Sequence, residues 1–512
     1  MPLDLNTLPV EARQVVENLQ AEILRLQTIL KLKDEQIRLW TIEKWGPKAD
    51  KLSQDQLALL PLELVVTAAE VEREAALPEA HKELPAVARA KKPRPNHPGR
   101  APLPAHLERR EVIIPCPPEE CRCGQCGAER PVIGYEIREE LDCVPARFFV
   151  RLTKREKRGS HCLPEQGVAV APVPLQIVPK SKLSNALMIE MLAAKFQQHQ
   201  PIYRLCAMLW EDHGLELSRQ TLNEAILRAA ALLTAVVRAM AVELLAGDYL
   251  QADETTVPCQ VPEKTGKNHR AYLWEYSSPG GIVVFQFEMG RGRAGPKEFL
   301  DSFKGILQCD GYGAYDQLGE GIIYMACMAH IRRGFVEAAK LAPEDPLPVE
   351  LVGEIDRLYQ IERQAKEKDL NAAERRELRQ AQSTPIMAAL KTRIIEVRQQ
   401  VTPGSKLAKA CDYALGQWSR MEVYLEHGRV EIDNNWCEGA MRPIALGRKN
   451  WLHVGDPSAG PKIAAIASIV ETCRRLDIPL RAYLGEILPK LADWPVNRVA
   501  ELTPRAWKTT RN

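Results

Sequence analysis

Three acidic side chains in the sequence stand where carboxylates can share a metal ion. Asp310 directly follows the short apolar run ILQC, Asp253 lies in the strand-like run DYLQADETTV, and Glu438 lies in DNNWCEGAMRP. A carboxylate at the mouth of a buried strand is costly unless it pairs, accepts hydrogen bonds or binds a metal. We therefore expect Asp310 to share its site with other functional groups.

The order of the predicted elements brings these three carboxylates together. Three β-rich runs, DYLQADETTVPCQ, AYLWEYSS and GIVVFQFE, precede the helix RAGPKEFLDSF and a fourth strand, GILQCDGY. This order, with an Asp on the first strand, an Asp ending the fourth and a Glu on a late helix, resembles a ribonuclease H-like domain. The resemblance implies that Asp253 and Asp310 lie on neighbouring strands and that the helix brings Glu438 alongside.

Three ionised carboxylates that converge repel one another and need a cation. Two charges about 4 Å apart cost on the order of 4 kcal/mol at an effective dielectric near 20. Hard oxygen ligands favour Mg²⁺ or Mn²⁺ over zinc. Two such ions about 4 Å apart activate a nucleophilic oxygen and stabilise the leaving oxygen of an in-line phosphoryl transfer. The residues therefore predict metal-dependent phosphoryl transfer.

Neighbouring acids compete for these roles, since an Asp at a strand end is more often a turn or cap residue than a ligand. Asp433 precedes two asparagines and is placed to cap the helix that carries Glu438. Glu254 follows Asp253 on a strand, so its side chain is expected on the other face. Arg442 shares a helix face with Glu438 and is placed either to pair with it or to contact a phosphate.

Several longer motifs closely resemble the insertion sequence 66 family of bacterial DDE transposases. They are ADETTV, QCDGYGAYD, CMAHIRRGF and, above all, EIDNNWCEGAMRPIALGRKNW, and the similarity extends to WGPKADKLSQDQLALL, HQPIYR and IVETCRRLDIPLRAYL. Carried over by motif, the catalytic triad is Asp253, Asp310 and Glu438. The resemblance implies binding to the double-stranded terminal repeats of the element, cleavage that frees a 3′-OH, and strand transfer into target DNA. It also implies small accessory proteins of the same element as partners.

A cysteine module forms a second candidate metal site. The thirteen cysteines are scattered along the chain and are expected to be reduced. Related transposases carry two CxxC pairs here, whereas this chain keeps Cys123-x-x-Cys126 and reduces the second pair to His161-Cys162. These four side chains, or Cys121 in place of His161, suit a tetrahedral zinc site, and a metal-free small domain is the alternative. The cysteines expected to be ordinary buried thiols are Cys143, Cys259 and Cys309.

Residues 12–40 carry a heptad pattern. Charged and amide side chains fill the positions outside its apolar stripe, which predicts a coiled coil that dimerises the protein. An amphipathic helix packed on its own chain is the alternative. The a and d positions are Val16, Leu19, Ile23, Leu26, Leu30, Lys33, Ile37 and Trp40.

Residues 181–245 read as helices, with a break at Gly214 and a cap at Ser218. The spacing fits a helix-turn-helix, and an ordinary helical hairpin is the alternative. A Pro-rich basic segment lies upstream, at 89–110, and suits either a solvated linker or phosphate contact. His330 is either a DNA contact or a structural histidine. The candidate DNA-contact residues are Arg94, Arg100, Arg219, Arg332, Arg442, Arg448 and Lys449.

The chain has 512 residues with a net charge of +2, too long for one hydrophobic core. Without an apolar run of about 18 residues or a signal-peptide pattern, we expect no membrane span and a cytoplasmic protein that joins the nucleoid when bound to DNA. The predicted class is multidomain α+β. Its expected parts are a coiled coil at 1–45, a helical segment and basic linker at 46–110, a zinc-finger-like cysteine module at 111–170, a helix-turn-helix-like region at 171–245, a ribonuclease H-like α/β catalytic domain at 246–455 with a helical insertion at about 345–428, and a helical tail at 456–512.

Two other function classes remain open from the residues. One is a DNA-binding protein that has lost catalysis, which the intact triad opposes and the reduced cysteine pairs favour. The other is a ribonuclease H-like nuclease that cuts without strand transfer, which has no need of the extended N-terminal half.

Overall fold

The structure is a computed structural model. It describes residues 10–45 and 148–511, the latter with gaps at 152, 156, 160–167, 171, 173, 180, 262–266 and 452. The chain divides into two compact units, Met1–Pro61 with Gly159–Asn512 and Leu62–Arg158. The predictions made for the basic linker and the cysteine module, including Arg94, Arg100, Cys123, Cys126, His161 and Cys162, lie outside the described residues.

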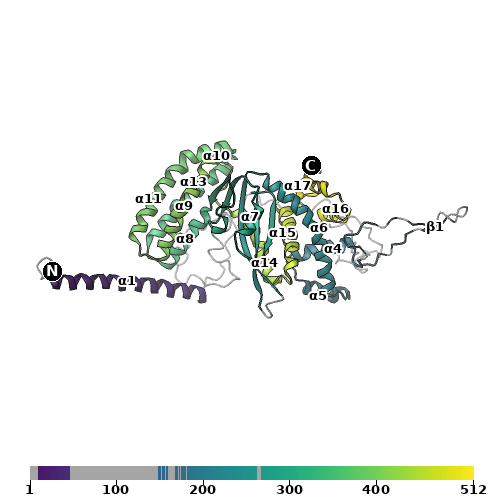
Figure 1. Ribbon diagram of the computed structural model, residues 1–512, viewed down its shortest axis with the longest axis horizontal. Helices are drawn as coiled ribbons and strands as arrows, with labels where there is room; N and C mark the ends of the chain where they lie inside the picture. Colours follow the sequence, from purple (N-terminus) through teal and green to yellow (C-terminus); the bar gives the residue numbers. More distant parts are fainter. Residues whose placement is uncertain are drawn as a thin grey trace, which may run out of the picture. The chain divides into compact units, whose positions relative to one another are not determined.

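A five-stranded mixed sheet lies at the centre of the larger unit (Figure 1). Its strand order is β5-β4-β3-β6-β7. The long strand β3 (Tyr249–Cys259) pairs antiparallel with β4 (His269–Ser277), which pairs antiparallel with β5 (Val283–Glu288). On its other side β3 pairs parallel with β6 (Gly305–Cys309), which pairs parallel with β7 (Ile322–Ala326).

The expected run of three strands, a helix and a fourth strand is present. The helix is α7 (Ala294–Phe299), between β5 and β6. The sequence MACMAHIRRGFVEAAK, expected to change from short and apolar to helical, provides the end of β7 and then α8 (Met328–Leu341). The first and fourth strands, β3 and β6, are neighbours as expected.

One end of the sheet is covered by helices from the C-terminal part of the chain. α14 (Asn435–Trp451) packs on β3 and β4, and α15 (Gly460–Arg475) packs on β5. Because β5 is an edge strand, its backbone N–H groups need partners. The hydroxyl of Ser468 accepts from Phe285 N at 2.8 Å. The stretch expected as a C-terminal tail therefore belongs to the core.

The other helices of the C-terminal part belong to the same unit. They are η6 (Pro457–Ala459), α16 (Leu480–Leu491), η7 (Val496–Leu502) and α17 (Pro504–Thr509).

The other end of the sheet is covered by α8 and the helical insertion. Tyr249, Ile306 and Met325 from the strands share one apolar core with Phe335 of α8. The capping box expected at Asn371 is present. The insertion consists of α9 (Pro346–Glu367), α10 (Ala372–Leu378), the π-helical turn η5 (Arg379–Ser383), α11 (Thr384–Gln400), α12 (Lys406–Gly416) and α13 (Trp418–Glu426).

A buried ion cluster joins the insertion to the segment that leads back to the sheet. Arg379 is fully buried and donates to both carboxylate oxygens of Glu362, at 2.7 and 2.8 Å. Its other donors reach the carbonyls of Tyr424, His427 and Val430, so all five of its N–H groups are used. Arg375 adds a second guanidinium, whose Nη2 lies 2.6 Å from Glu362 Oε2.

The helices before the sheet are α4 (Asn185–Phe196), α5 (Ile202–His213) and α6 (Arg219–Leu245). Gly214 ends α5 with a φ of 61°, a left-handed conformation that favours glycine. The Ser218 hydroxyl accepts from Thr221 N at 3.0 Å, so the predicted cap is confirmed. Two short strands, β1 (Lys157–Gly159) and β2 (Val168–Val170), pair with each other.

Among the described residues, one helix is long and apolar enough to cross a membrane, and it is α6. It packs against α4, α15 and α16. Its contacts are those of a core helix in a globular protein.

The heptad segment forms one long helix, α1 (Val10–Trp45). Most of the apolar heptad side chains that the structure describes are exposed in the single chain, with Leu19 at 58% and Leu30 at 63%. A helix with an apolar stripe left open in this way is typical of a coiled-coil strand without its partner.

The buried ion cluster predicts that Glu362→Gln strongly destabilises the insertion. Removing one partner of a buried pair costs about 3–5 kcal/mol, since the fully buried Arg379 loses its carboxylate; the partly buried Arg375 keeps Glu431 as a partner. Thermal unfolding followed by circular dichroism should show a clearly lower midpoint. The matched control is Glu350→Gln, which breaks the half-exposed pair with Arg393 on the same insertion and should leave the midpoint nearly unchanged. Equal effects from the two variants would contradict this role of Glu362.

Candidate active site

The register of the two central parallel strands brings Asp253 beside Asp310. Gln251 of β3 is paired with Gln308 of β6, and two residues further along the strands stand the two aspartates. Asp253 is inside β3, and Asp310 directly follows β6. Both aspartates are half-buried. Parallel pairing therefore places these two carboxylates at the same edge of the sheet.

A buried set of hydrogen bonds attaches the segment before α14 to this pair of strands. Gln251 Nε2 donates to Gln308 Oε1 at 2.8 Å and to the carbonyl of Asp433 at 2.9 Å. Gln251 Oε1 accepts from Cys437 N at 3.3 Å, and Gln308 Nε2 donates to the carbonyl of Glu431 at 3.1 Å. Both glutamines are fully buried. The start of α14 is thus tied to the sheet immediately before Glu438.

Glu438 lies in the first turn of α14 and interacts with both aspartates. Burial, together with the carboxylates of Glu254, Glu438 and Asp310, raises the pKa of Asp253 well above its usual value. Burial also raises the pKa of Glu438; Arg333 opposes this rise, and Asp310 adds to it. The three predicted carboxylates therefore share one electrostatic environment, in which a cation would offset their repulsion.

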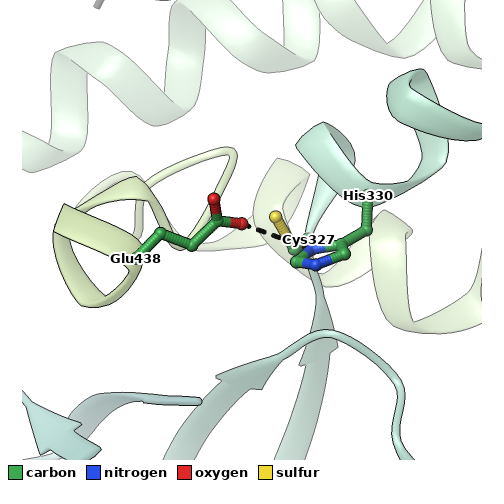
Figure 2. Close-up of side chains that lie close together, drawn as sticks. All are labelled: Cys327, His330 and Glu438. Atoms are coloured by element: carbon green, nitrogen blue, oxygen red, sulfur yellow. Dashed lines mark ion pairs between the residues drawn. The ribbon is translucent and has the colours of Figure 1, made fainter. Parts of the chain in front are cut away.

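Glu438 also faces two residues at the start of α8, as Figure 2 shows for His330 and Cys327. His330 Nδ1 lies 3.7 Å from Glu438 Oε1. Arg333 Nη2 lies 3.4 Å from both carboxylate oxygens of Glu438. Burial lowers the pKa of His330 to about 4, an effect that nearby Arg333 strengthens. The imidazole is therefore neutral at physiological pH.

The loop that carries Asp310 is fixed from the insertion. Gly311 has a φ of 83°, and a Cβ at this position would lie 2.9 Å from the side chain of Gln417. Asp310 Oδ1 accepts from Tyr312 N at 2.9 Å, and the hydroxyl of Tyr413 donates to the Asp310 carbonyl. A short 3-10 turn, η4 (Gly313–Tyr315), follows. The insertion thus supplies contacts that set the backbone of a predicted metal ligand.

The two rival acids have other partners. Asp433 is buried, and its carboxylate accepts from the backbone N of Asn435 at 3.1 Å, so it caps the start of α14. Glu254 accepts from Arg291 Nη2 at 2.5 Å and from the Tyr315 hydroxyl at 2.8 Å. Each carboxylate is therefore occupied by protein groups.

The predicted DNA-contact residues fall into two groups. Arg332 Nε donates to Asp356 of α9 at 2.7 Å, and Arg448 Nη1 donates to the Thr256 hydroxyl at 2.9 Å, so both hold elements of the unit together. The others in the described part of the chain have exposed side chains. These are Arg219, Arg442 and Lys449.

Sequence reasoning missed Arg333, Tyr413 and Gln417. Arg333 was detectable, because it lies three residues after His330 and therefore on a neighbouring part of the same helix face. Tyr413 and Gln417 come from the insertion about a hundred residues beyond Asp310, and no local pattern marks them. The predicted ordinary thiols Cys259 and Cys309 are both buried.

Comparison with known proteins identifies the class. The family model for "Transposase IS66 family" matches residues 180–462, "Transposase C of IS166 homeodomain" matches 34–112, and "zinc-finger binding domain of transposase IS66" matches 120–162. Two relatives come from Sinorhizobium fredii. "Uncharacterized protein y4hP" is 31% identical over 94% of this chain and 88% of its own length, and "Uncharacterized protein y4qI" is 32% identical over 95% and 92%.

The α+β fold, its sheet-edge carboxylates and these matches define a DNA-binding transposase. The chain belongs to the IS66 transposase family.

The buried glutamine network predicts that Gln251→Met lowers both stability and the precision of the site. Methionine fills the space but leaves the Cys437 N–H and the Asp433 carbonyl without their partner, at about 1–3 kcal/mol for each buried group. Urea denaturation should show a lower midpoint. Gln286→Met, on the half-exposed part of edge strand β5, is the control and should behave like the wild type. A wild-type midpoint for Gln251→Met would show that the network does not hold α14.

Proposed function

We propose that this transposase cuts the ends of its insertion sequence and joins them to target DNA with Asp253, Asp310 and Glu438 as its catalytic triad. The observation that carries the proposal is the strand register that sets Asp253 and Asp310 at one edge of the sheet, together with the hydrogen bonds that tie the start of α14, and so Glu438, to the same strands. The electrostatic interactions among the three carboxylates support a shared site.

The topology supports a ribonuclease H-like catalytic domain. In chain order the strands of the sheet are arranged 3-2-1-4-5, with the first three antiparallel and the last two parallel to the first. The helical insertion lies between the second aspartate and the glutamate. Residues 246–455 would therefore form the catalytic domain, extended by α15, which covers the edge strand β5.

The donor set fits a hard divalent cation. Carboxylate oxygens from three separate elements are the ligands that Mg²⁺ and Mn²⁺ prefer. Bound by the triad, a pair of such ions would activate the attacking oxygen and stabilise the leaving oxygen. Asp253 and Asp310, from the same edge of the sheet, would hold the ions together with Glu438 of α14.

The reaction requires two in-line displacements and no energy cofactor. In the first, a water oxygen forms a bond to phosphorus, the P–O3′ bond breaks, and the element's end leaves as a 3′-OH. In the second, that 3′ oxygen forms a bond to a target phosphorus and the target's own 3′ oxygen leaves. Each step breaks one P–O bond and forms another. Arg333, beside Glu438, is placed to neutralise the phosphate that enters the site.

Substrate binding would involve several parts of the chain. The exposed Arg219, at the start of α6, and the exposed Arg442 and Lys449 of α14 are proposed DNA contacts. Arg94 and Arg100 of the basic linker would add phosphate contacts. Two element ends need two active sites, and the open apolar stripe of α1 suits a parallel coiled coil with a second copy.

The triad predicts that Asp310→Asn abolishes transposition. Bacteria carry a plasmid copy of the element with its own ends and any accessory genes, and they produce either the wild-type protein or Asp310→Asn. Immunoblotting checks that the two proteins are present at equal levels. The frequency should fall on the order of a thousandfold or more, as expected when a group that stabilises charge at the reacting phosphate is lost. Asp253→Asn and Glu438→Gln should behave in the same way.

Glu320→Gln, an exposed acid just beyond the Asp310 loop, is the matched control and should transpose like the wild type. Transposition by Asp310→Asn at the wild-type frequency contradicts the triad. Cutting of any duplex by purified protein, without preference for element ends, favours a simple nuclease instead.

The cysteine module is proposed to hold a structural zinc through Cys123, Cys126, Cys162 and His161. A chain with Cys123→Ser and Cys126→Ser should lose about one zinc per chain, because two of four tetrahedral ligands are removed. Elemental analysis of the purified full-length proteins measures this. Cys143→Ser, which changes a predicted ordinary thiol, should keep the full zinc content; equal content in all three proteins would exclude the site.

A further inference from the structure

We propose a separate transition-metal site, formed by Cys327, His330 and Glu438, that binds an ion of the zinc class and competes with the carboxylate triad for Glu438. One ligand atom from each residue lies within 4.8 Å of the other two. Figure 2 shows the three side chains pointing toward one another, two from the start of α8 and one from α14. Thiolate, imidazole and carboxylate form the mixed donor set that zinc and cobalt accept, whereas Mg²⁺ does not bind sulfur.

The local sequence explains why the two α8 residues converge. Cys327 is the N-cap of α8, and His330 is three residues further on, so a C-x-x-H spacing places both side chains over the first turn of the helix. Glu438 also lies in the first turn of its helix, α14. Three ligands on two helix ends, both anchored to the sheet, make a site with little freedom to rearrange.

The distances are close to those of a tetrahedral ion. Bonds of about 2.0–2.3 Å place neighbouring ligand atoms roughly 3.5 Å apart. His330 Nδ1 and Glu438 Oε1 are already 3.7 Å apart. The other distances between ligand atoms are at most 4.8 Å, so they must shorten by about an ångström when an ion binds. Rotation of the side chains can supply this change.

The ligand atoms have few competing partners. His330 Nδ1 is buried and, within the part of the chain that the structure describes, has no hydrogen-bond partner. Cys327 is fully buried, and its Sγ accepts a weak hydrogen bond from Asn434 N at 3.4 Å and another from the backbone N–H of His330. Asn434 is itself fully buried, and neither polar atom of its side-chain amide is hydrogen-bonded to a described residue. A buried polar group without a partner is costly, and a bound ion would offset that cost for His330.

Four charged neighbours act on this site, namely Arg333, Asp310, Asp433 and Arg442. Arg333 lies 3.4 Å from Glu438 and would have to move aside when an ion takes the same oxygens. Asp310 interacts with His330 and favours a cation there. Binding converts the Cys327 thiol to a thiolate and releases its proton to solvent. A divalent ion is then balanced by the thiolate and the Glu438 carboxylate.

The consequence for catalysis rests on the proposed role of Glu438. An ion held by Cys327 and His330 would draw Glu438 away from the Mg²⁺ pair, because one carboxylate cannot take both positions. Zinc should therefore inhibit Mg²⁺-dependent cleavage, and the C-x-x-H pair should set the concentration at which it does so.

The binding test uses the full-length chain and Co²⁺ as the probe. Titration followed by absorbance reports thiolate-to-cobalt charge transfer, and equilibrium dialysis reports the number of ions bound. Wild type should bind about one more Co²⁺ than Cys327→Ser or His330→Gln, since loss of a ligand weakens a site by about tenfold or more. Cys123→Ser, in the cysteine module, separates the two sites, because it should keep the contribution of Cys327.

The inhibition test compares Zn²⁺ titrations of cleavage in Mg²⁺, each protein normalised to its own rate without zinc. Cys327→Ser should need about tenfold more zinc than wild type for half inhibition. Equal Co²⁺ stoichiometry and equal absorbance in wild type, Cys327→Ser and His330→Gln would overturn the site. A Co²⁺ difference without any cleavage by wild type would keep the metal site and contradict the proposed function instead.

Discussion

The site depends on the buried hydrogen bonds between Gln251, Gln308 and the backbone of residues 431–437. Two amide side chains at the centre of a sheet are costly unless every polar atom finds a partner. Here they find them in each other and in the chain that returns from the insertion. Satisfying the glutamines and placing Glu438 beside the aspartates are thus the same requirement, which explains why polar side chains stand inside the two central strands.

The insertion determines the site from the other side. Its buried Glu362–Arg379 pair fixes the carbonyls of Tyr424, His427 and Val430, on the path toward α14. The insertion also contacts the Asp310 loop through Tyr413 and Gln417. A segment that could be regarded as an appendage is therefore linked to two of the three carboxylates.

Local features were predictable from the sequence, and features that depend on long-range packing were not. The Ser218 cap, the capping box at Asn371 and the order of the strands are set by nearby residues or by periodicity. The triad itself stays a prediction, made from an acid in the first strand, an acid at the end of the fourth and an acid on a late helix. Arg332 and Arg448, predicted as DNA contacts, bond to Asp356 and Thr256 within the chain, and charge alone does not show which partner folding brings near. The role of α15 beside β5 had no signal, since an edge strand is defined only in the sheet.

The most direct test of the central claim is the anomalous scattering of Mn²⁺ in crystals of the full chain bound to a duplex element end. The account predicts two Mn²⁺ peaks about 4 Å apart, coordinated by Asp253, Asp310 and Glu438, with the scissile phosphate between them. Mn²⁺ bound by Asp433 or Glu254 in place of a triad member, or an element end seated away from the β3–β6 edge, would contradict it.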